Sequence, residues 1–297
     1  MTTPESAAHA PIAPRPASYR ERVRTIVLTV VAALVVFVIV FPFLWILISS
    51  FKDPENFLSV KLSDAVPHAL HVGSYRLALG RTSLLHWIWN SFLVATITTL
   101  ISLLVCAPAA YALARLRFRG RGLTSTFLVG AYAVPSITLV VPMFVVLVKL
   151  HLNDTYIGLI LVHASFTIPF ATWVLSDFYR SLPQDLEEAG YVDGASLFSV
   201  LRHIVLPLSI PGLLAAGAYS FILSWNDFLF ALVIMNSNAH FTAPVGIHAY
   251  FTGRSITEEV WAELMAASTL VTLPSVILFG FFQRYMVSGF LSGAVKG

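Results

Sequence analysis

The chain is poor in charge and almost free of cysteine. Only 11% of its 297 residues are charged, against about 25% in an average soluble domain. This scarcity, with 57% hydrophobic residues, excludes a soluble or disordered chain. A net charge of only +3 excludes a nucleic-acid reader. Cys106 is the single cysteine, which excludes an intrachain disulfide and a cysteine-based zinc site; we expect it to be a small buried side chain.

The sequence also lacks the signatures of an energy-converting or hydrolytic site. No stretch matches GxxxxGK[ST], HExxH or GxSxG, and the segment Gly120–Gly122 indicates a turn in a basic loop. The histidines and acids are scattered, with no ligand-like pair inside one apolar segment. We therefore expect no catalytic residue, no metal site and no cofactor in this chain, and an energy source in a partner or a gradient.

Long apolar runs dominate what is present. A transmembrane helix needs about 20 mostly apolar residues. Six stretches qualify, which predicts an all-α, polytopic membrane protein. They are Thr25–Ser49, Ile88–Ala114, Leu123–Val148, Tyr156–Tyr179, Leu206–Met235 and Leu264–Val287.

The distribution of Lys and Arg predicts the orientation. Twelve of the eighteen fall on the side of both termini, including the run Arg115–Arg121, so both termini are expected in the cytoplasm. This run is interpreted as a positive-inside anchor. Residues 1–24 are expected to form a disordered cytoplasmic tail, and residues 25–297 the membrane domain. Two long external segments, Phe51–Trp87 and Asn236–Glu263, are large enough to contact an external partner.

The inner loop 180–205 has an unusual pattern. Ser181 is expected to cap a first short helix, Gly194 permits a sharp stop, and Ala195–Val205 restarts as a second helix. Pro207 and Pro211 mark the return into the membrane. A rigid pair of short helices at the membrane face suits insertion into a groove of another protein.

This loop carries a resemblance to a known family. It contains Glu188-Ala189-Gly190, then Asp193-Gly194, nine residues, Ile204, one residue, and Leu206-Pro207. The pattern resembles the EAA signature of bacterial ABC-importer permeases, E-A-A, three residues, G, nine residues, I-x-L-P. Gly190 stands where the family usually has alanine, which lowers helix propensity by roughly 1 kcal/mol without changing the spacing.

Three further stretches are similar to the maltose-type, MalG-like branch of carbohydrate permeases. Asn90-Ser91 lies near the start of the second span, and Ser224–Ala231 is similar to a W-N-[DE]-F-L-F segment. The C-terminal Val295-Lys296-Gly297 resembles the V-K-G ending of that branch. The resemblance covers about residues 25–297.

The resemblance implies a type I ABC-importer permease (MetI-like) fold in a bacterial inner membrane. It also implies a second permease subunit, two ATPase subunits that hold ATP and Mg²⁺, and an extracytoplasmic solute-binding protein. Residues expected to contact an ATPase are Glu187, Glu188, Ala189, Gly190, Asp193, Gly194, Ile204, Leu206 and Pro207. The tail 288–297, with Val295, Lys296 and Gly297, is expected to reach between the ATPases. Asn236–Glu263 is expected to face the binding protein.

A few polar groups inside the predicted spans are candidates for function, because such groups are costly in lipid. Asn226 and Asp227, in the interior of the fifth span, either line the pathway or fix helix packing; Trp225 shares this assignment. Asn90 is expected at an interface, capping the second span, and His163 is expected to be a satisfied bundle histidine. Prolines are expected to kink the spans, Pro135 and Pro142 among them. The tryptophans expected as interfacial anchors are Trp45, Trp87, Trp89 and Trp261.

Several functions stay open on sequence alone. The leading one is import of a neutral di- or oligosaccharide, because no convergent Arg or Lys for a phosphate is evident in the spans. Glycerol phosphate or a polyol is the alternative within the same class. A gradient-driven secondary transporter is the alternative of another class, but no internal repeat is evident and Asp227 is the only acid in the interior of a predicted span. A membrane-embedded enzyme would need an acid/base or metal cluster, and the sequence shows none.

Overall fold

The computed structural model describes residues 19–58, 67, 69–255 and 257–294. It divides into two units, Met1–Leu47 and Ile48–Gly297. The first unit holds nearly all of helix α1 (Tyr19–Ser49), whose apolar segment has a mean hydropathy of 3.1 and is long enough to cross a membrane. Because α1 begins at Tyr19, residues 19–24 are helical rather than part of a disordered tail. The predicted tail otherwise lies outside the described residues.

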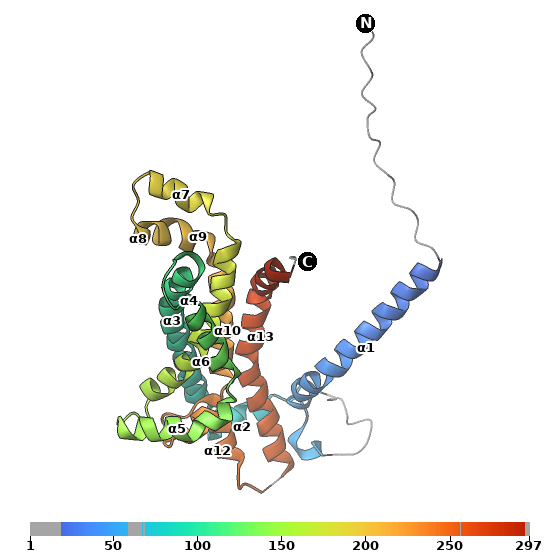
Figure 1. Ribbon diagram of the computed structural model, residues 1–297. Coiled ribbons are helices and arrows are strands. Elements are labelled where there is room, and N and C mark those ends of the chain that lie inside the picture. The colour runs from blue at the N-terminus through green and yellow to red at the C-terminus, as the bar shows by residue number, and fades with distance from the viewer. Residues whose placement is uncertain (1–18, 59–66, 68, 256, 295–297) are drawn as a thin grey trace. The chain divides into compact units, whose positions relative to one another are not determined.

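The second unit is a bundle of helices without a strand in its described residues. Its α-helices are α2 (Gly73–Arg81), α3 (Leu84–Arg115), α4 (Arg121–Ala133), α5 (Ser136–Lys149), α6 (Tyr156–Ser181), α7 (Asp185–Val192), α8 (Leu197–Val200), α9 (Leu206–Leu208), α10 (Ile210–Trp225), α11 (Leu229–Ile234), α12 (Ala243–Phe251) and α13 (Glu258–Ala294). A 3₁₀ turn (Pro54–Asn56) precedes α2, and a π-helical segment (Leu201–Val205) joins α8 to α9. Within this unit, α7 and α8 lie at one end, here termed the α7–α8 end, and α2 and α12 lie at the other (Figure 1).

Three of the predicted spans are single long helices. α3, α6 and α13 contain the stretches predicted for the second, fourth and sixth spans, and each is apolar enough to cross a membrane. α3 and α6 pack against each other, with the hydroxyls of Ser102 and Thr167 2.6 Å apart in the buried contact. Small and hydroxyl residues allow such close approach between helices in lipid.

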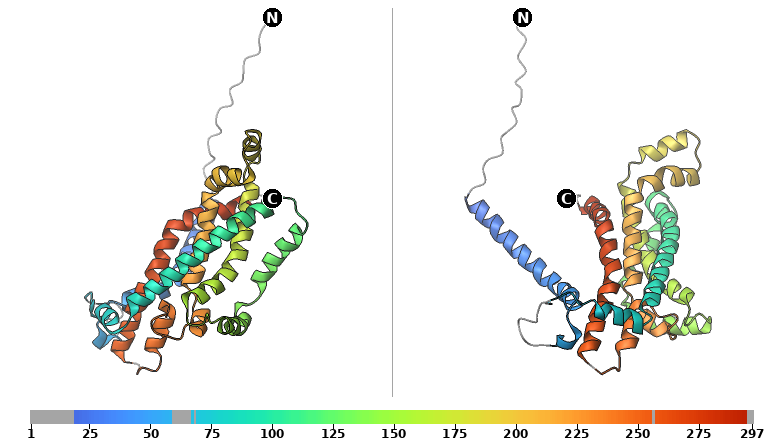
Figure 2. Two further views of the ribbon diagram at one scale, coloured as in Figure 1. Left: turned by 90° about the vertical axis from the view of Figure 1, so that its left-hand side faces the viewer. Right: turned by 180° about the vertical axis from the view of Figure 1, so that it is seen from behind.

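The predicted third span is broken into two helices. α4 and α5 are bent by 97° at Val134–Pro135, a break rather than the expected kink (Figure 2). The proline explains the break, because its ring disfavours helical geometry at the preceding residue. Val134 has an extended backbone with ψ 124°. Pro142, by contrast, lies inside α5.

The predicted fifth span is also interrupted, at two places. The segment Leu197–Leu208 bends by 78° into α10, and α10 ends at Trp225 before α11 begins at Leu229. Counted with each bent pair as one span, the described residues provide six candidate spans, four of them as single helices. The prediction of an all-α, six-span protein is therefore confirmed at the level of the fold, although two of the spans are not continuous helices.

Candidate functional site

The α7–α8 segment is a helix, a glycine turn and a second helix, as the sequence predicts. Gly194 has a left-handed backbone with φ +82°. The Gly194 N–H donates to the Tyr191 carbonyl and the Ala195 N–H donates to the Gly190 carbonyl, each at 3.0 Å. These two bonds form a Schellman motif, which satisfies the end of α7 and requires glycine at the left-handed position. The chain is thereby turned back sharply toward the membrane.

The expected capping role of Ser181 is wrong. Ser181 is the last residue of α6, and its hydroxyl donates to the Phe178 carbonyl at 2.7 Å. α7 begins instead after Gln184, which provides no side-chain cap. The acidic first turn, with Asp185, Glu187 and Glu188, is present as expected near the positive end of the helix dipole.

Gly190 is packed against the second half of the motif. A Cβ atom added to it would lie 2.7 Å from Cδ1 of Ile204 and 3.4 Å from Cγ2 of Val200. The glycine therefore lets α7 approach the π-helical segment closely, and Ile204 fills the space that an alanine methyl would need. The two motif residues Gly190 and Ile204 therefore contact each other within the segment. Sequence reasoning did not identify this contact.

Glu187 points into the protein rather than outward. Its Oε1 accepts from Arg115 Nε at 2.7 Å and its Oε2 accepts from the Tyr111 hydroxyl at 3.0 Å; both charged side chains are only 8% exposed. Arg115 also donates to the Leu182 carbonyl at 2.8 Å. This buried ion pair ties α7 to the end of α3. The expectation that Glu187 itself contacts a partner does not agree with this burial.

The remaining motif residues present an outward face at the α7–α8 end. Glu188, Ala189, Asp193 and Pro207 are exposed, and Ile204 and Leu206 are half-buried. Large apolar side chains surround them, among them Val192 at 88% and Phe198 at 68% exposure. The other exposed members are Leu186, Tyr191, Leu197, Leu208 and Ile210. An exposed apolar patch around charged groups is typical of a protein-interaction surface.

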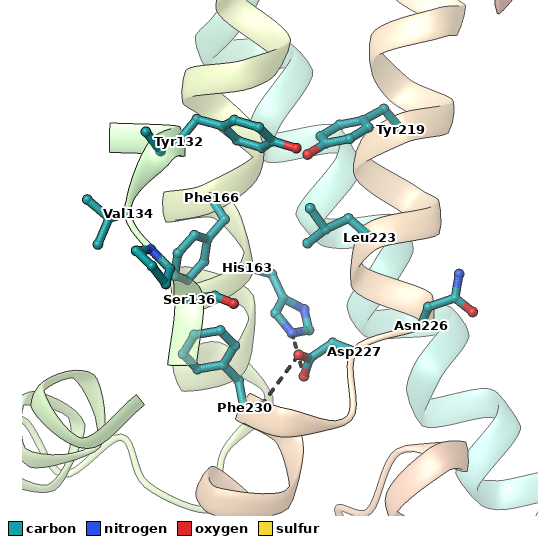
Figure 3. Close-up of a pocket in the computed structure, with 12 residues that line it drawn as sticks. Tyr132, Val134, Ser136, His163, Phe166, Tyr219, Leu223, Asn226, Asp227 and Phe230 are labelled. Carbon is teal, nitrogen blue, oxygen red and sulfur yellow. Dashed lines mark hydrogen bonds and ion pairs between the residues drawn. The ribbon is translucent and has the colours of Figure 1, made fainter. Parts of the chain in front are cut away.

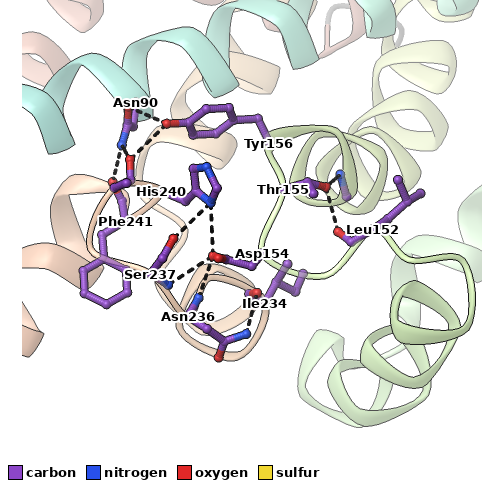
Figure 4. A network of polar contacts seen from close by, with 12 residues as sticks. Asn90, Leu152, Asp154, Thr155, Tyr156, Ile234, Asn236, Ser237, His240 and Phe241 are labelled. Atoms are coloured by element: carbon purple, nitrogen blue, oxygen red, sulfur yellow. Dashed lines mark hydrogen bonds and ion pairs between the residues drawn. The ribbon is translucent and has the colours of Figure 1, made fainter.

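At the opposite end a polar network holds the loop between α11 and α12 (Figure 4). The amide nitrogen of Asn90 donates to the carbonyls of Ala239 and Phe241, both at 2.9 Å, and the Tyr156 hydroxyl donates to Asn90 Oδ1 at 2.9 Å. Asn90 is buried in the second turn of α3, after the helix start at Leu84, so it does not cap that helix. It fixes the loop instead.

Asp154 anchors the same loop from the turn before α6. Its Oδ1 accepts from the backbone N–H groups of Asn236 at 2.9 Å and Ser237 at 3.1 Å, and lies 3.3 Å from His240 Nδ1. Burial by itself would raise the pKa of Asp154. The hydrogen bonds from Asn236, Ser237 and His240 outweigh burial, so its pKa is lowered from the ordinary aspartate value.

Two tryptophans assigned from sequence have packing roles. Trp87 is 3% exposed and donates from Nε1 to Asn238 Oδ1 at 2.8 Å, so it is a core residue and not an interfacial anchor. Its ring lies directly against Gly246 of α12. Trp225 is buried, donates to the Val271 carbonyl at 3.3 Å and stacks on Phe221. For Trp225 the packing alternative therefore agrees with the structure.

Asp227 lies at a helix break rather than within a continuous helix. It accepts from the backbone N–H groups of Phe230 at 3.4 Å and Ala231 at 2.9 Å, which caps α11. Its Oδ2 lies 3.2 Å from Nε2 of His163, whose Nδ1 is 2.7 Å from the Ser224 hydroxyl. Asn226, its neighbour, ends α10, and its side chain points away from His163 (Figure 3).

The His163–Asp227 pair forms one wall of a cavity of about 450 Å³ between α4, α5, α6, α10 and α11. The other lining residues are Tyr132, Ala133, Val134, Pro135, Ser136, Phe166, Tyr219, Leu223, Asn226 and Phe230. Sequence reasoning missed Tyr132 and Tyr219, which are ordinary aromatic residues in apolar runs. No group of three or more His, Cys, Asp or Glu in the described residues could hold a metal ion. Val295, Lys296 and Gly297 lie outside the described residues.

These features define a class of protein: a helical, multi-pass membrane component with an interaction surface at one end, an anchored loop at the other and a polar cavity between. The comparison with protein families names it. A model of the family described as "Binding-protein-dependent transport system inner membrane component" matches residues 106–291. The chain belongs to this family, and it is thus a pore-forming, inner-membrane component of an ABC transport system.

Two relatives are similar in sequence to this chain over nearly its whole length. The trehalose/maltose transport system permease protein MalG of Thermococcus litoralis is 36% identical over 280 residues, 93% of this chain and 99% of the relative. The trehalose transport system permease protein SugB of Mycobacterium tuberculosis is 39% identical over 272 residues, 90% of this chain and 96% of the relative.

A solved structure shows the same fold. One chain of a bacterial ABC transporter involved in the import of the acidic polysaccharide alginate matches with a TM-score of 0.75 and 20% identity, covering 92% of this chain and 99% of that chain. The MetI-like permease fold expected from the inner-loop motif is therefore confirmed.

Proposed function

We propose that this chain is one of two permease subunits of an ATP-driven importer that moves a neutral di- or oligosaccharide into the cytoplasm. Two ATPase subunits, which would hold ATP and Mg²⁺, dock on the α7–α8 segment, and a solute-binding protein delivers the sugar to the opposite end. The trehalose and maltose named for two relatives support a neutral sugar.

The outward face of α7 is the observation that carries this proposal. Glu188, Ala189 and Asp193 are exposed on a rigid hairpin, with apolar neighbours such as Phe198 that a groove on an ATPase would cover. The four basic positions between Arg115 and Arg121 lie beside this end, which supports a cytoplasmic location for it. The tail that ends at Gly297 is proposed to reach the same ATPases.

Two contacts transmit a movement of the hairpin into the membrane. The ion pair between Arg115 and Glu187 joins α7 to α3, and Gly190 and Ile204 lock α7 to the segment that leads into α10. A pull on α7 by closing ATPases therefore moves α3 and α10 together. Because α10 carries Tyr219 and Leu223, the same movement reshapes the cavity wall.

The outer loop is held ready for a partner on the other side. Asn90, Asp154 and Tyr156 fix the backbone of Asn236–Phe241 through hydrogen bonds to its peptide groups. A preorganised loop loses little conformational freedom on docking, which favours binding. We propose that the loaded solute-binding protein docks on this loop.

The test is affinity purification of the chain from its native membrane, with mass spectrometry of what is bound, followed by uptake in proteoliposomes. The expected result is recovery of an ATPase, a second permease and a solute-binding protein, with uptake of labelled trehalose or maltose that needs ATP and the binding protein. Recovery of the chain alone, with uptake driven by a proton or sodium gradient, would contradict the proposal and favour a secondary transporter.

A variant series then tests the docking face in the purified complex. Glu188→Lys and Asp193→Lys place positive charge on the proposed contact, and Gly194→Pro prevents the left-handed turn because proline fixes φ near −65°. Each is expected to uncouple ATP hydrolysis from uptake. Assembly and uptake at the wild-type rate in all three would show that this face does not couple the two.

A further inference from the structure

We propose that the cavity between α4, α5, α6, α10 and α11 is a binding site for one hexose unit of a neutral sugar, carried by this subunit itself. The inference rests on the proposed function, since it names the part of the importer that holds the solute in transit. Its volume of about 450 Å³ lies within the ~300–1,000 Å³ range of small-molecule sites.

Asp227 has acceptor capacity left for a sugar hydroxyl. A carboxylate can accept about four hydrogen bonds. Two backbone N–H groups donate to this one, Phe230 to Oδ1 and Ala231 to Oδ2, while His163 Nε2 lies 3.2 Å from Oδ2 without hydrogen-bond alignment. Oδ1 therefore keeps an acceptor position, and a hydroxyl donor from a ligand suits it.

His163 supplies a donor on the same wall. The residue is only 1% exposed, and Nε2, although 3.2 Å from Asp227, has no aligned hydrogen-bond partner in the described part of the chain. Nδ1 is held by the Ser224 hydroxyl at 2.7 Å, which orients the ring. A buried polar atom without an aligned partner is costly, and a ligand hydroxyl oxygen placed beside Asp227 would satisfy it.

Aromatic side chains form the rest of the wall. Phe166 and Phe230 lie beside the Asp227 side of the cavity, 5.0 Å apart between ring centroids. On the other side the hydroxyls of Tyr132 and Tyr219 point toward each other (Figure 3). A sugar ring has apolar C–H faces and hydroxyl edges, so aromatic walls with a few polar groups match both of its surfaces.

The two tyrosines are held in place by a third ring. Phe170 of α6 lies 4.0 Å from the ring of Tyr219 and 5.1 Å from that of Tyr132. Because Tyr132 is on α4 and Tyr219 on α10, a relative movement of these helices separates the hydroxyls. The pair thus closes this side of the cavity in one arrangement and opens it in another.

The charge of the wall selects against anionic solutes. None of the twelve lining residues is Arg or Lys, and Asp227 is an acid. A phosphate or sulfonate group would meet a carboxylate without a compensating cation, which is unfavourable in a low-dielectric site. Neutral sugars avoid this cost. The site is therefore expected to discriminate between sugars that share a ring but differ in charge.

The test uses the whole complex with its binding protein in proteoliposomes, with labelled trehalose as the probe. Leu223→Trp fills the cavity, and Leu104→Trp on the exposed side of α3 is the matched control. Tyr219→Phe removes one hydroxyl and keeps the ring. Uptake at saturating loaded binding protein and the ATPase rate stimulated by that protein are measured together, and a photoactivatable trehalose reports the contact by peptide mapping.

The expected result is uptake at least about tenfold lower in Leu223→Trp and about three- to tenfold lower in Tyr219→Phe, the loss of one ligand hydrogen bond. Stimulated ATPase activity stays within twofold of wild type, Leu104→Trp transports normally, and the photolabel falls on peptides of α10 or α6. Normal uptake in both cavity variants, or a label confined to the second permease, overturns the site while the importer stands. Absence of ATP-dependent uptake by the wild-type complex contradicts the proposed function itself.

Discussion

The buried ion pair between Arg115 and Glu187 allows the coupling mechanism to be tested with one substitution. Glu187→Gln removes the negative charge but keeps the shape of the side chain. Both partners are only 8% exposed, so solvent screens the interaction weakly and Arg115 is left as an uncompensated charge. Breaking such a pair costs about 3–5 kcal/mol.

This cost weakens the packing of α7 against α3, because Glu187 connects the two helices. At about 1.4 kcal/mol per factor of ten, the population of undocked α7 is expected to rise roughly 10²- to 4 × 10³-fold. The double variant with Arg115→Met should lose less than Glu187→Gln alone, since it removes the buried charge as well.

Hydrogen exchange of the amides in Asp185–Val192 measures this population in the purified complex. Asp185→Asn is the matched control, because Asp185 is an exposed acid on the same helix. We expect faster exchange and less sugar moved per ATP hydrolysed in Glu187→Gln, and little change in exchange in Asp185→Asn. Equal exchange in wild type and Glu187→Gln would refute the claim that this pair fixes α7.

Three further predictions concern the ends of the bundle. Gly194→Ala keeps open space around the new methyl but strains φ +82°, so α7 should lose about 1 kcal/mol of stability, measurable by hydrogen exchange. Gly246→Ala forces a Cβ into the ring of Trp87 and should lower the thermal midpoint through about 1–3 kcal/mol of overpacking, whereas Gly80→Ala meets open space and should not. The lowered pKa of Asp154 means that its stabilisation is fully present above the unfolded-state value near 3.9 and is lost as the pH falls through the lower folded-state pKa. The protection factors of the Asn236–Phe241 amides, which correct for the base-catalysed intrinsic exchange, should therefore be constant from pH 8 to 5, and Asp154→Ala should lower them throughout; a fall in protection near pH 6.5 in wild type would contradict this assignment.

The long spans could be predicted from sequence because hydropathy reports length and composition well. α3, α6 and α13 contain the predicted stretches, and the turn at Gly194 follows from the few residues that accept a left-handed backbone. Hydropathy carries no information on the direction of a helix axis, however. The two helices on either side of the 97° bend at Val134–Pro135 therefore appear in the sequence as one apolar run, and only the backbone geometry separates them.

The parts that sequence reasoning missed depend on contacts between distant residues. Arg115 and Glu187 are 72 positions apart, so nothing in the local pattern shows that Glu187 faces inward while Glu188 faces outward. The same holds for Tyr132 and Tyr219, which come together only because α4 and α10 flank one cavity. Asp227 was identified as an intramembrane acid, but its cap on α11 required the helix break to be seen.

Site-directed cross-linking from the outward face of α7 tests the central claim most directly. Cys106 is the only native cysteine and is buried, so Glu188→Cys introduces one accessible thiol, and the exposed Ser255 at the opposite end provides the control Ser255→Cys. In the native-membrane complex, a short cross-linker with one thiol-reactive arm and one photoactivatable arm should join position 188 to an ATPase subunit, with a yield that changes when ATP is bound, and should not join position 255 to it. An ATPase that cross-links equally to both positions, or to neither, would contradict the coupling role of α7.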